Sequence, residues 1–352
     1  MRDNYKPDVS KYFAAANSYK GFVSFFDNVF PSDKFDRIYV LKGGPGTGKS
    51  SFMKKASESL KDKKYRIEEI YCSSDPNSLD GLIIENKGKR VAILDGTAPH
   101  ERDAVIPGAI DEIINLGNGW DSRWLKAKKD KILKIGKEKS AAYKSAYSYL
   151  KIAGCADDFI MSIYKLVFDE NKAKNKAEEI LSDIPTSKNQ QILTRLISSF
   201  GRYGYHKIDD YESDLGHVIR VNGDEYPSFL FIEKVNETAR SKGISFVNLL
   251  SPLNPGSSEG ISFIGAGLSI LKADVGEINS VDFLKDDKIY SERTRRAKEI
   301  KKVALEEAER WFSIASELHF QLEEIYGSAM NFEKNNELID NKIREIDNIL
   351  KN

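Results

Sequence analysis

Residues 38–61 read IYVLKGGPGTGKSSFMKKASESLK and contain the strongest motif in the chain. GGPGTGKS at 43–50 fits the pattern G-x-x-x-x-G-K-[ST], between a strand-like apolar run and a helix-compatible run. In such a loop the glycines turn backbone N–H groups toward an anion, and the helix N-terminus adds its positive dipole end. We therefore predict a phosphate-binding loop formed by Gly43, Gly44, Pro45, Gly46, Thr47, Gly48, Lys49, Ser50 and Ser51.

Two side chains of this loop carry the expected chemistry. Lys49 should reach the β- and γ-phosphates, and the Ser50 hydroxyl should ligate Mg²⁺. A second metal-binding group is Asp95, which ends the apolar run VAIL at 91–94. That run predicts a buried parallel strand, at whose end a phosphate-loop protein places a carboxylate for Mg²⁺ or its water.

The catalytic base is not obvious from the sequence. Gly96 stands where many ATPases of this type carry a water-activating glutamate. His100 and Glu101 follow on the expected loop at the carboxyl edge of the sheet, and a histidine beside carboxylates can act as a general base. Alternatively, these residues only cap a following helix.

The stretch CSSDPNSLDG at 72–81 follows the strand-like YRIEEIY and has two interpretations. It is either a switch loop that contacts nucleotide or acceptor, with Asp75 and Asp80 as its polar residues, or an Asp-Pro turn followed by a helix cap. The turn is the simpler alternative for each residue taken singly.

Composition excludes several classes of protein. The 352 residues include 54 basic and 54 acidic side chains, so the formal net charge is zero. The overall charge therefore does not indicate binding to nucleic acid or to an anionic membrane. The first residues lack an apolar leader, and no run approaches a membrane span, which predicts a cytoplasmic protein without membrane contact. Cys72 and Cys155 lack metal or disulfide spacing, and we expect ordinary thiols.

An internal repeat organises the chain. A shift of 179 positions aligns residues 38–81 with 217–260 without a gap. The two segments then share eight identical residues and a similar order of apolar and helix-like stretches. Proline-free segments follow each αβ-like segment and favour long helices. We predict an α/β protein with two tandem, parallel-sheet, P-loop-like domains and these boundaries: 1–123 nucleotide-binding domain, 124–186 helical arm, 187–285 degenerate domain, and 286–352 helical tail.

The second half lacks the residues that bind phosphate. Glu225, Pro227, Ser228 and Phe229 stand opposite Gly46, Gly48, Lys49 and Ser50, and Lys272 stands opposite Asp95. A carboxylate repels an anion, and proline has no N–H to donate. One functional nucleotide site is therefore expected, with an arginine from the second half as a conceivable activator; the candidates are Arg293, Arg295 and Arg296.

The stretches GGPGTGKSSFMKK, CSSDPNSLDG, VAILDGTAPHERDAVIPGAIDEI and NLGNGWD resemble a family of uncharacterised bacterial ATPases with two P-loop halves in one chain. The resemblance is strong over residues 36–125 and only architectural over 190–283. It implies that Lys49 and Ser50 bind ATP and magnesium, and that DGTAPH forms the edge of the site. Both halves of such proteins generally look able to bind nucleotide, and the chain departs from that pattern at 222–229.

The function expected from these patterns is a slow Mg²⁺-dependent ATPase or an ATP-controlled switch. A small-molecule or nucleotide kinase uses the same loop but usually has arginine-rich lids, and arginine is sparse around these motifs. A non-hydrolysing scaffold that binds a protein partner through the helical arms is the third alternative. The sequence contains no base-specific motif that separates ATP from GTP, and it leaves the oligomeric state open.

Overall fold

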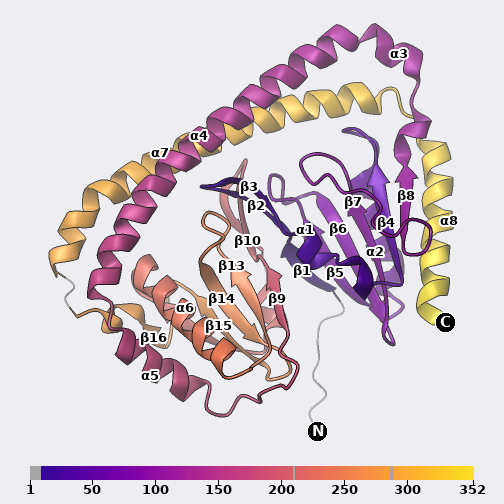
Figure 1. The fold of residues 1–352 in the computed structure, drawn as a ribbon. Coiled ribbons are helices and arrows are strands. Elements are labelled where there is room, and N and C mark those ends of the chain that lie inside the picture. Colours follow the sequence, from indigo (N-terminus) through magenta and orange to yellow (C-terminus); the bar gives the residue numbers. More distant parts are fainter. Residues whose placement is uncertain (1–8, 209–210, 286–287) are drawn as a thin grey trace.

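The computed structural model describes residues 9–208, 211–285 and 288–352. Two six-stranded sheets lie next to each other, and a pair of long helices runs along one side of both (Figure 1). The mixed α/β class and the two successive sheets agree with the predicted organisation. Residues 1–8, where no leader is expected, lie outside the described part.

The first sheet has the strand order β1–β5–β6–β7–β4–β8. Its strands are β1 (Val9–Phe13), β4 (Arg37–Lys42), β5 (Arg66–Tyr71), β6 (Leu79–Asn86), β7 (Lys89–Asp95) and β8 (Asp111–Asn115). The smaller elements of this half are the hairpin β2 (Ala15–Ser18) and β3 (Gly21–Ser24), the helices α1 (Phe26–Val29) and α2 (Lys49–Lys61), and the 3-10 turns η1 (Ser32–Lys34) and η2 (Leu116–Gly119). Buried apolar residues of α2 pack on this sheet.

The second sheet repeats this order as β9–β13–β14–β15–β12–β16. Its strands are β9 (Ile192–Arg195), β12 (His217–Asn222), β13 (Phe246–Leu250), β14 (Ser258–Phe263), β15 (Leu268–Lys272) and β16 (Ile278–Asn279). The hairpin β10 (Ser198–Gly201) and β11 (Gly204–Lys207), the turns η3 (Tyr211–Asp214) and η4 (Ser280–Phe283), and helix α6 (Glu225–Ser241) complete this half. The same strand order in both halves supports the predicted internal repeat.

The sheets are mostly parallel rather than wholly parallel, which corrects the expectation. β6 runs antiparallel to both β5 and β7, and β14 to both β13 and β15. The reason is local: β6 and β7 are joined by the two residues Lys87 and Gly88, both at positive φ, and so tight a turn can only reverse the chain. Two reversals leave β5 pointing the same way as β4 and β7, so their carboxyl ends share one edge.

Strand pairing refines the alignment of the two halves. Leu41 of β4 lies opposite Asp95 at the end of β7, and Val221 of β12 lies opposite Lys272 at the end of β15, so Leu41 matches Val221 with a shift of 180. In the helices, Phe52 matches Phe231, a shift of 179. The gapless alignment is therefore one residue out of register along the first strand.

Long helices exchange between the halves. After α3 (Ser122–Ala127), α4 (Lys129–Val167) runs from the first sheet to the second, where α5 (Glu170–Ile180) packs on α6 (Figure 1). Helix α7 (Lys288–Gly327) returns along α4, and α8 (Phe332–Lys351) covers the first sheet. Each arm thus delivers its last helix to the opposite half, whereas the sequence predicted only one arm for each half.

Apolar burial holds the crossing helices in place. The hydrophobic core of the first sheet includes Ile339, Ile343 and Ile346 of α8. The core of the second sheet includes Ala173 and Ala177 of α5. No helix in the described ranges is both long and apolar enough to cross a membrane.

Candidate functional site

The glycine-rich loop joins β4 to α2, in the order that the motif requires. Gly46 and Gly48 have φ of 67° and 89°, a region that side chains with a Cβ rarely adopt, and α2 begins at Lys49. Thr47 closes the loop by donating from its hydroxyl to the Gly44 carbonyl at 2.9 Å. The backbone conformation is thus set by the glycines at these positions.

Lys49 and Asp95 face each other across the loop. The Nζ atom lies 3.6 Å from Asp95 Oδ2 and donates to the carbonyls of Gly43 and Gly44 at 3.0 Å each. Asp95 reaches this place because β7 pairs with β4 in parallel, which puts Asp95 opposite Leu41. Both predicted residues are therefore brought together.

Asp95 is held by its own turn. The backbone N–H and the hydroxyl of Thr97 donate to Oδ1 at 2.8 and 2.6 Å, which leaves Oδ2 toward Lys49. Burial raises the pKa of Asp95, and the nearby Asp80 carboxylate raises it further, against the lowering effect of Lys49. Asp80 is thus part of the electrostatic environment of this site.

The loop after β5 is a turn that leads into a strand. Asp75 accepts from the N–H of Asn77 at 3.1 Å, and β6 starts at Leu79, so the predicted helix cap is wrong. The Leu79 N–H donates to Ser50 Oγ at 2.9 Å, which ties this turn to the start of α2. Residues 72–78 therefore border the phosphate loop.

His100 is enclosed rather than open. Its ring stacks on Phe26 with centroids 4.4 Å apart, and Nε2 lies 2.9 Å from Asp80 Oδ2. Glu101 is exposed on the same loop, at the carboxyl edge as expected. Residues 101–110 contain no helix, so the alternative in which His100 and Glu101 cap one is wrong.

Packing explains why residue 96 is a glycine. A Cβ atom at Gly96 would lie 2.4 Å from Val40 Cγ1 and 3.0 Å from the Arg102 carbonyl. A glutamate at this position would require Val40 or the Arg102 carbonyl to shift. Close packing at the strand end therefore favours glycine over glutamate at position 96.

The returning helices cover the loop, which the sequence did not indicate. The Glu323 carbonyl lies so close to Gly46 that a Cβ there would approach it to 2.5 Å. The pKa of Glu323 is lowered, chiefly by a hydrogen bond with His319. The Gly46 N–H and the charge of Lys49 lower it further. A carboxylate of α7 therefore already uses the anion-binding potential of the loop.

An aromatic cavity lies beside the loop. It has a volume of about 630 Å³ and includes Trp120, Trp124, Met330 and Phe332 in its lining. The Trp120 ring packs on Gly44 and lies 5.5 Å from the ring of Tyr326. Its indole N–H is buried without an acceptor in the described part of the chain.

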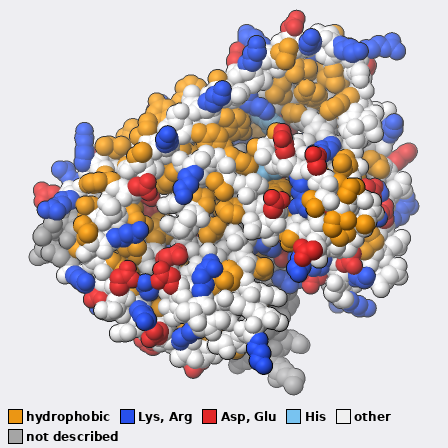
Figure 2. All heavy atoms as spheres, in the orientation of Figure 1, with side chains coloured by type: hydrophobic (Ala, Val, Ile, Leu, Met, Phe, Trp, Pro, Cys, Tyr) orange, Lys and Arg blue, Asp and Glu red, His pale blue; other side chains and the backbone are white. Residues whose placement is uncertain are grey.

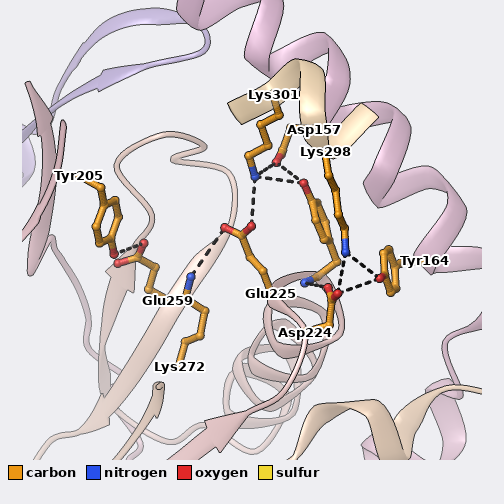
Figure 3. A network of polar contacts seen from close by, with 10 residues as sticks. Asp157, Tyr164, Tyr205, Asp224, Glu225, Glu259, Lys272, Lys298 and Lys301 are labelled. Carbon is orange, nitrogen blue, oxygen red and sulfur yellow. Dashed lines mark hydrogen bonds and ion pairs between the residues drawn. The ribbon is translucent and has the colours of Figure 1, made fainter. Parts of the chain in front are cut away.

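The equivalent place in the second half is filled by protein. Helix α6 begins at Glu225, three residues before Ser228, which matches Lys49 in the helix register; a turn of helix replaces the last part of the loop. Lys272, at the end of β15, lies 3.7 Å from Glu225 Oε1 (Figure 3). The predicted loss of phosphate-binding residues thus has a structural counterpart.

Helix α7 adds two lysines to the Glu225–Lys272 pair, and we call the resulting group of charged side chains the second cluster (Figure 3). Lys301 Nζ lies 2.6 Å from Asp157 of α4 and 3.2 Å from Glu225, and Lys298 Nζ lies 2.7 Å from Asp224. Burial alone would raise the pKa of Glu225, but Lys301 and Lys272 outweigh it and lower that pKa. These ion pairs join both arms to α6, and no pattern in the sequence pointed to them.

Comparisons with known proteins add no relative. A scan against protein-family models, a search of curated proteins and a search of solved structures each found no match. Within the described residues, no group of three or more His, Cys, Asp and Glu side chains could hold a metal ion by itself. Any metal at the loop would therefore need ligands besides these side chains.

Proposed function

We propose that the first half binds Mg-ATP in the loop at 43–50 and that the protein is a slow ATPase or an ATP-controlled switch. The observation that supports this most directly is the meeting of Lys49 and Asp95 at 3.6 Å beside a glycine loop that opens a helix. A cation for phosphate and a carboxylate for metal are the two charges that such a site requires.

The residues present fit magnesium together with phosphate. Ser50 offers a hydroxyl at the start of α2, and Asp95 offers Oδ2, the oxygen that Thr97 leaves free. Magnesium prefers oxygen ligands and is commonly held by one or two protein groups plus substrate phosphates. When bound, it would neutralise charge on the phosphate oxygens.

Two features support a slow rate and a switch. Close packing at Gly96 disfavours a glutamate next to Asp95, and the usual water-activating residue is missing there. Glu323 interacts with the same Gly46 N–H and Lys49 charge that phosphate needs, so binding has to displace this part of α7. Since α7 continues into α8 and runs back to the second half, such a displacement would be transmitted to both.

The aromatic cavity beside Gly44 is suited to a nucleotide base. Trp120 and Trp124 in its lining provide aromatic surface on which a base could stack. A base bound there would change the fluorescence of two of the three tryptophans. Comparison of ATP with GTP in this assay would also establish the base preference.

The test is calorimetric titration of the full chain with a non-hydrolysable ATP analogue and Mg²⁺, repeated with the GTP analogue. We expect one site per chain, lost when EDTA removes the metal. Two sites would contradict the assignment of the second half as degenerate. Absence of binding would refute the proposal.

Partner binding through the arms is a second candidate, supported by the surface. Apolar side chains gather along the pair of long helices in Figure 2, and Phe159, Leu166 and Val303 are 48%, 74% and 59% exposed. A partner on this face would sense movement of α7. ATP-dependent elution of the purified complex from immobilised protein would test whether the two events are coupled.

A further inference from the structure

The two β-hairpins cross between the halves in a reciprocal way. The tip of β2–β3 reaches the second half, where the Tyr19 N–H donates to the Leu253 carbonyl at 2.9 Å. The tip of β10–β11 reaches the first half, where Gly201 packs against the carbonyls of Ser73 and Ser74. The loops that receive them, after β13 and β5, are equivalent in the repeat.

Equivalent positions on these tips carry different side chains. A shift of 183 aligns β2 with β10 and places Tyr19 opposite Arg202. Tyr19 contacts the closed second cluster: burial raises its pKa, and the charges of Asp157 and Glu225 raise it further. The half that carries the phosphate loop thus receives a cation from its neighbour, and the degenerate half receives an uncharged ring.

Arg202 lies beside the turn at 72–78 that borders the loop at 43–50. Its Nη1 is 4.0 Å from Asp75 Oδ2, on the turn that Ser50 binds through Leu79. The guanidinium also lies 4.7 Å from the Phe320 ring centroid, and Phe320 is one helical turn before Glu323, which covers Gly46. Arg202 is therefore held between the turn that adjoins Ser50 and the part of α7 that adjoins Gly46.

The environment of Arg202 leaves part of its binding capacity unused. The side chain is 19% exposed, and its Nε–H is buried without an acceptor in the described part of the chain. Its ion pair with Asp75 is at the limit of contact distance. By contrast, Arg296, one of the arginines expected to act across the junction, pairs with Glu299. It stands two residues before Lys298, which binds Asp224 of the second half.

We propose that Arg202 is the residue from the second half that contacts the terminal phosphate of the nucleotide and stabilises its transfer to water. This rests on the proposed function. In the reaction, the water oxygen bonds to the γ-phosphorus while the bond to the β–γ bridging oxygen breaks. That oxygen leaves on ADP with the electron pair, and the proton of water passes to the released phosphate. Arg202 neutralises the negative charge that develops on these oxygens.

The test compares Arg202→Ala and Arg202→Lys with the wild type in three measurements. These are the melting temperature, the affinity for a non-hydrolysable Mg-ATP analogue, and single-turnover hydrolysis with trapping of Mg-ADP-aluminium fluoride. We expect unchanged folding, analogue affinity within about threefold, and a loss of about 10³-fold in rate and of stable trapping in Arg202→Ala. Arg202→Lys should restore little of the rate or of the trapping, since lysine cannot form the same bidentate contact.

Tyr19→Phe is the matched control at the equivalent position, and its turnover should equal that of the wild type. Wild-type rate and trapping in Arg202→Ala would overturn the proposal for Arg202. An equal loss of analogue affinity and of rate in both Arg202 variants would also overturn it, because that would indicate a structural role. If the wild type itself binds no analogue, the proposed function fails, and this outcome is distinct from the others.

Discussion

The two halves place an ion pair at the end of corresponding strands but reverse the charges. In the first half, Lys49 at the start of the helix faces Asp95 on the strand at 3.6 Å; in the second, Glu225 on the helix faces Lys272 on the strand at 3.7 Å. In the proposed function, phosphate binds where the helix start is cationic and the loop offers N–H groups. Where the helix start is acidic and the loop has become helix, the same strand ends instead hold protein together.

The difference extends to how each site contacts the arms. In the second half, Lys301 of α7 is buried and pairs with both Asp157 and Glu225, so ion pairs fasten this end of the arm. In the first half, the end of α7 touches the loop through Glu323, which is half-exposed. One end of α7 is thus anchored, and the other is in a position to be displaced.

The largest expected effect is on the anchored end. Lys301→Ala leaves the buried carboxylate of Asp157 without its cation, whereas the partly exposed Glu225 keeps Lys272, so we expect a cost of about 3 kcal/mol of unfolding free energy. Urea unfolding would measure it. The neighbouring Lys302 is exposed and pairs at 3.9 Å with Glu306, which is exposed as well, so Lys302→Ala should change stability by less than about 0.5 kcal/mol. Equal effects of the two variants would contradict an anchor at Lys301.

The next effect separates the two loops by ligand binding. Lys49→Ala should weaken binding of a non-hydrolysable Mg-ATP analogue by about 100-fold, since a charged hydrogen bond to phosphate contributes about 2–3 kcal/mol. Ser228→Ala, at the matching position of the second half, should leave affinity and stoichiometry unchanged. Calorimetry gives both quantities, and a reduced number of sites in Ser228→Ala would show that the second half binds nucleotide.

A smaller change tests whether α7 competes with phosphate. Glu323→Gln removes the charge that interacts with Gly46 and Lys49, and should raise analogue affinity about fivefold, or ~1 kcal/mol, because this carboxylate is only partly buried. Glu324→Gln changes the adjacent, exposed residue and should leave affinity as it is. Weaker binding in Glu323→Gln would mean that Glu323 supports the nucleotide instead of competing with it.

The local parts of this picture could be predicted from sequence. The strand, glycine loop and helix around Lys49 follow from residue types whose backbone preferences and periodicity act over a few positions, and the run ending at Asp95 is apolar enough to predict its strand. The reversal at β6 was missed because CSSDPNSLDG was interpreted as a turn that a helix could follow, whereas its last three residues begin β6. The two-residue turn at Lys87 and Gly88 was the available indication.

The remaining features depend on contacts between distant segments. Amphipathic spacing predicts that α7 and α8 are helices, but the same spacing is compatible with packing on either half. Likewise, nothing local distinguishes Arg202 or Lys301 from a solvated side chain. Their positions follow from the exchange of arms and hairpins, which only the assembled fold establishes.

The smallest effect near neutral pH, and the last comparison, concerns protonation. Asp95 must be ionised to hold a metal, and burial together with the Asp80 charge raises its pKa. On acidification, analogue affinity should therefore begin to fall at a higher pH than an ordinary aspartate would cause. The fall should be at most about tenfold per pH unit. The pKa of Glu225 is lowered instead; its pairing stabilises the fold above the unfolded-state pKa and is lost only as pH falls through the lower folded value. As pH is lowered, analogue affinity should therefore be lost before the ion pairs of the second cluster are lost. Calorimetry and urea unfolding across one pH series would compare the two.

Because nucleotide phosphates also titrate, Asp80→Asn supplies the control. Removing that charge should move the acid limb of the affinity curve to lower pH. A limb that stays in place would assign the titration to the ligand.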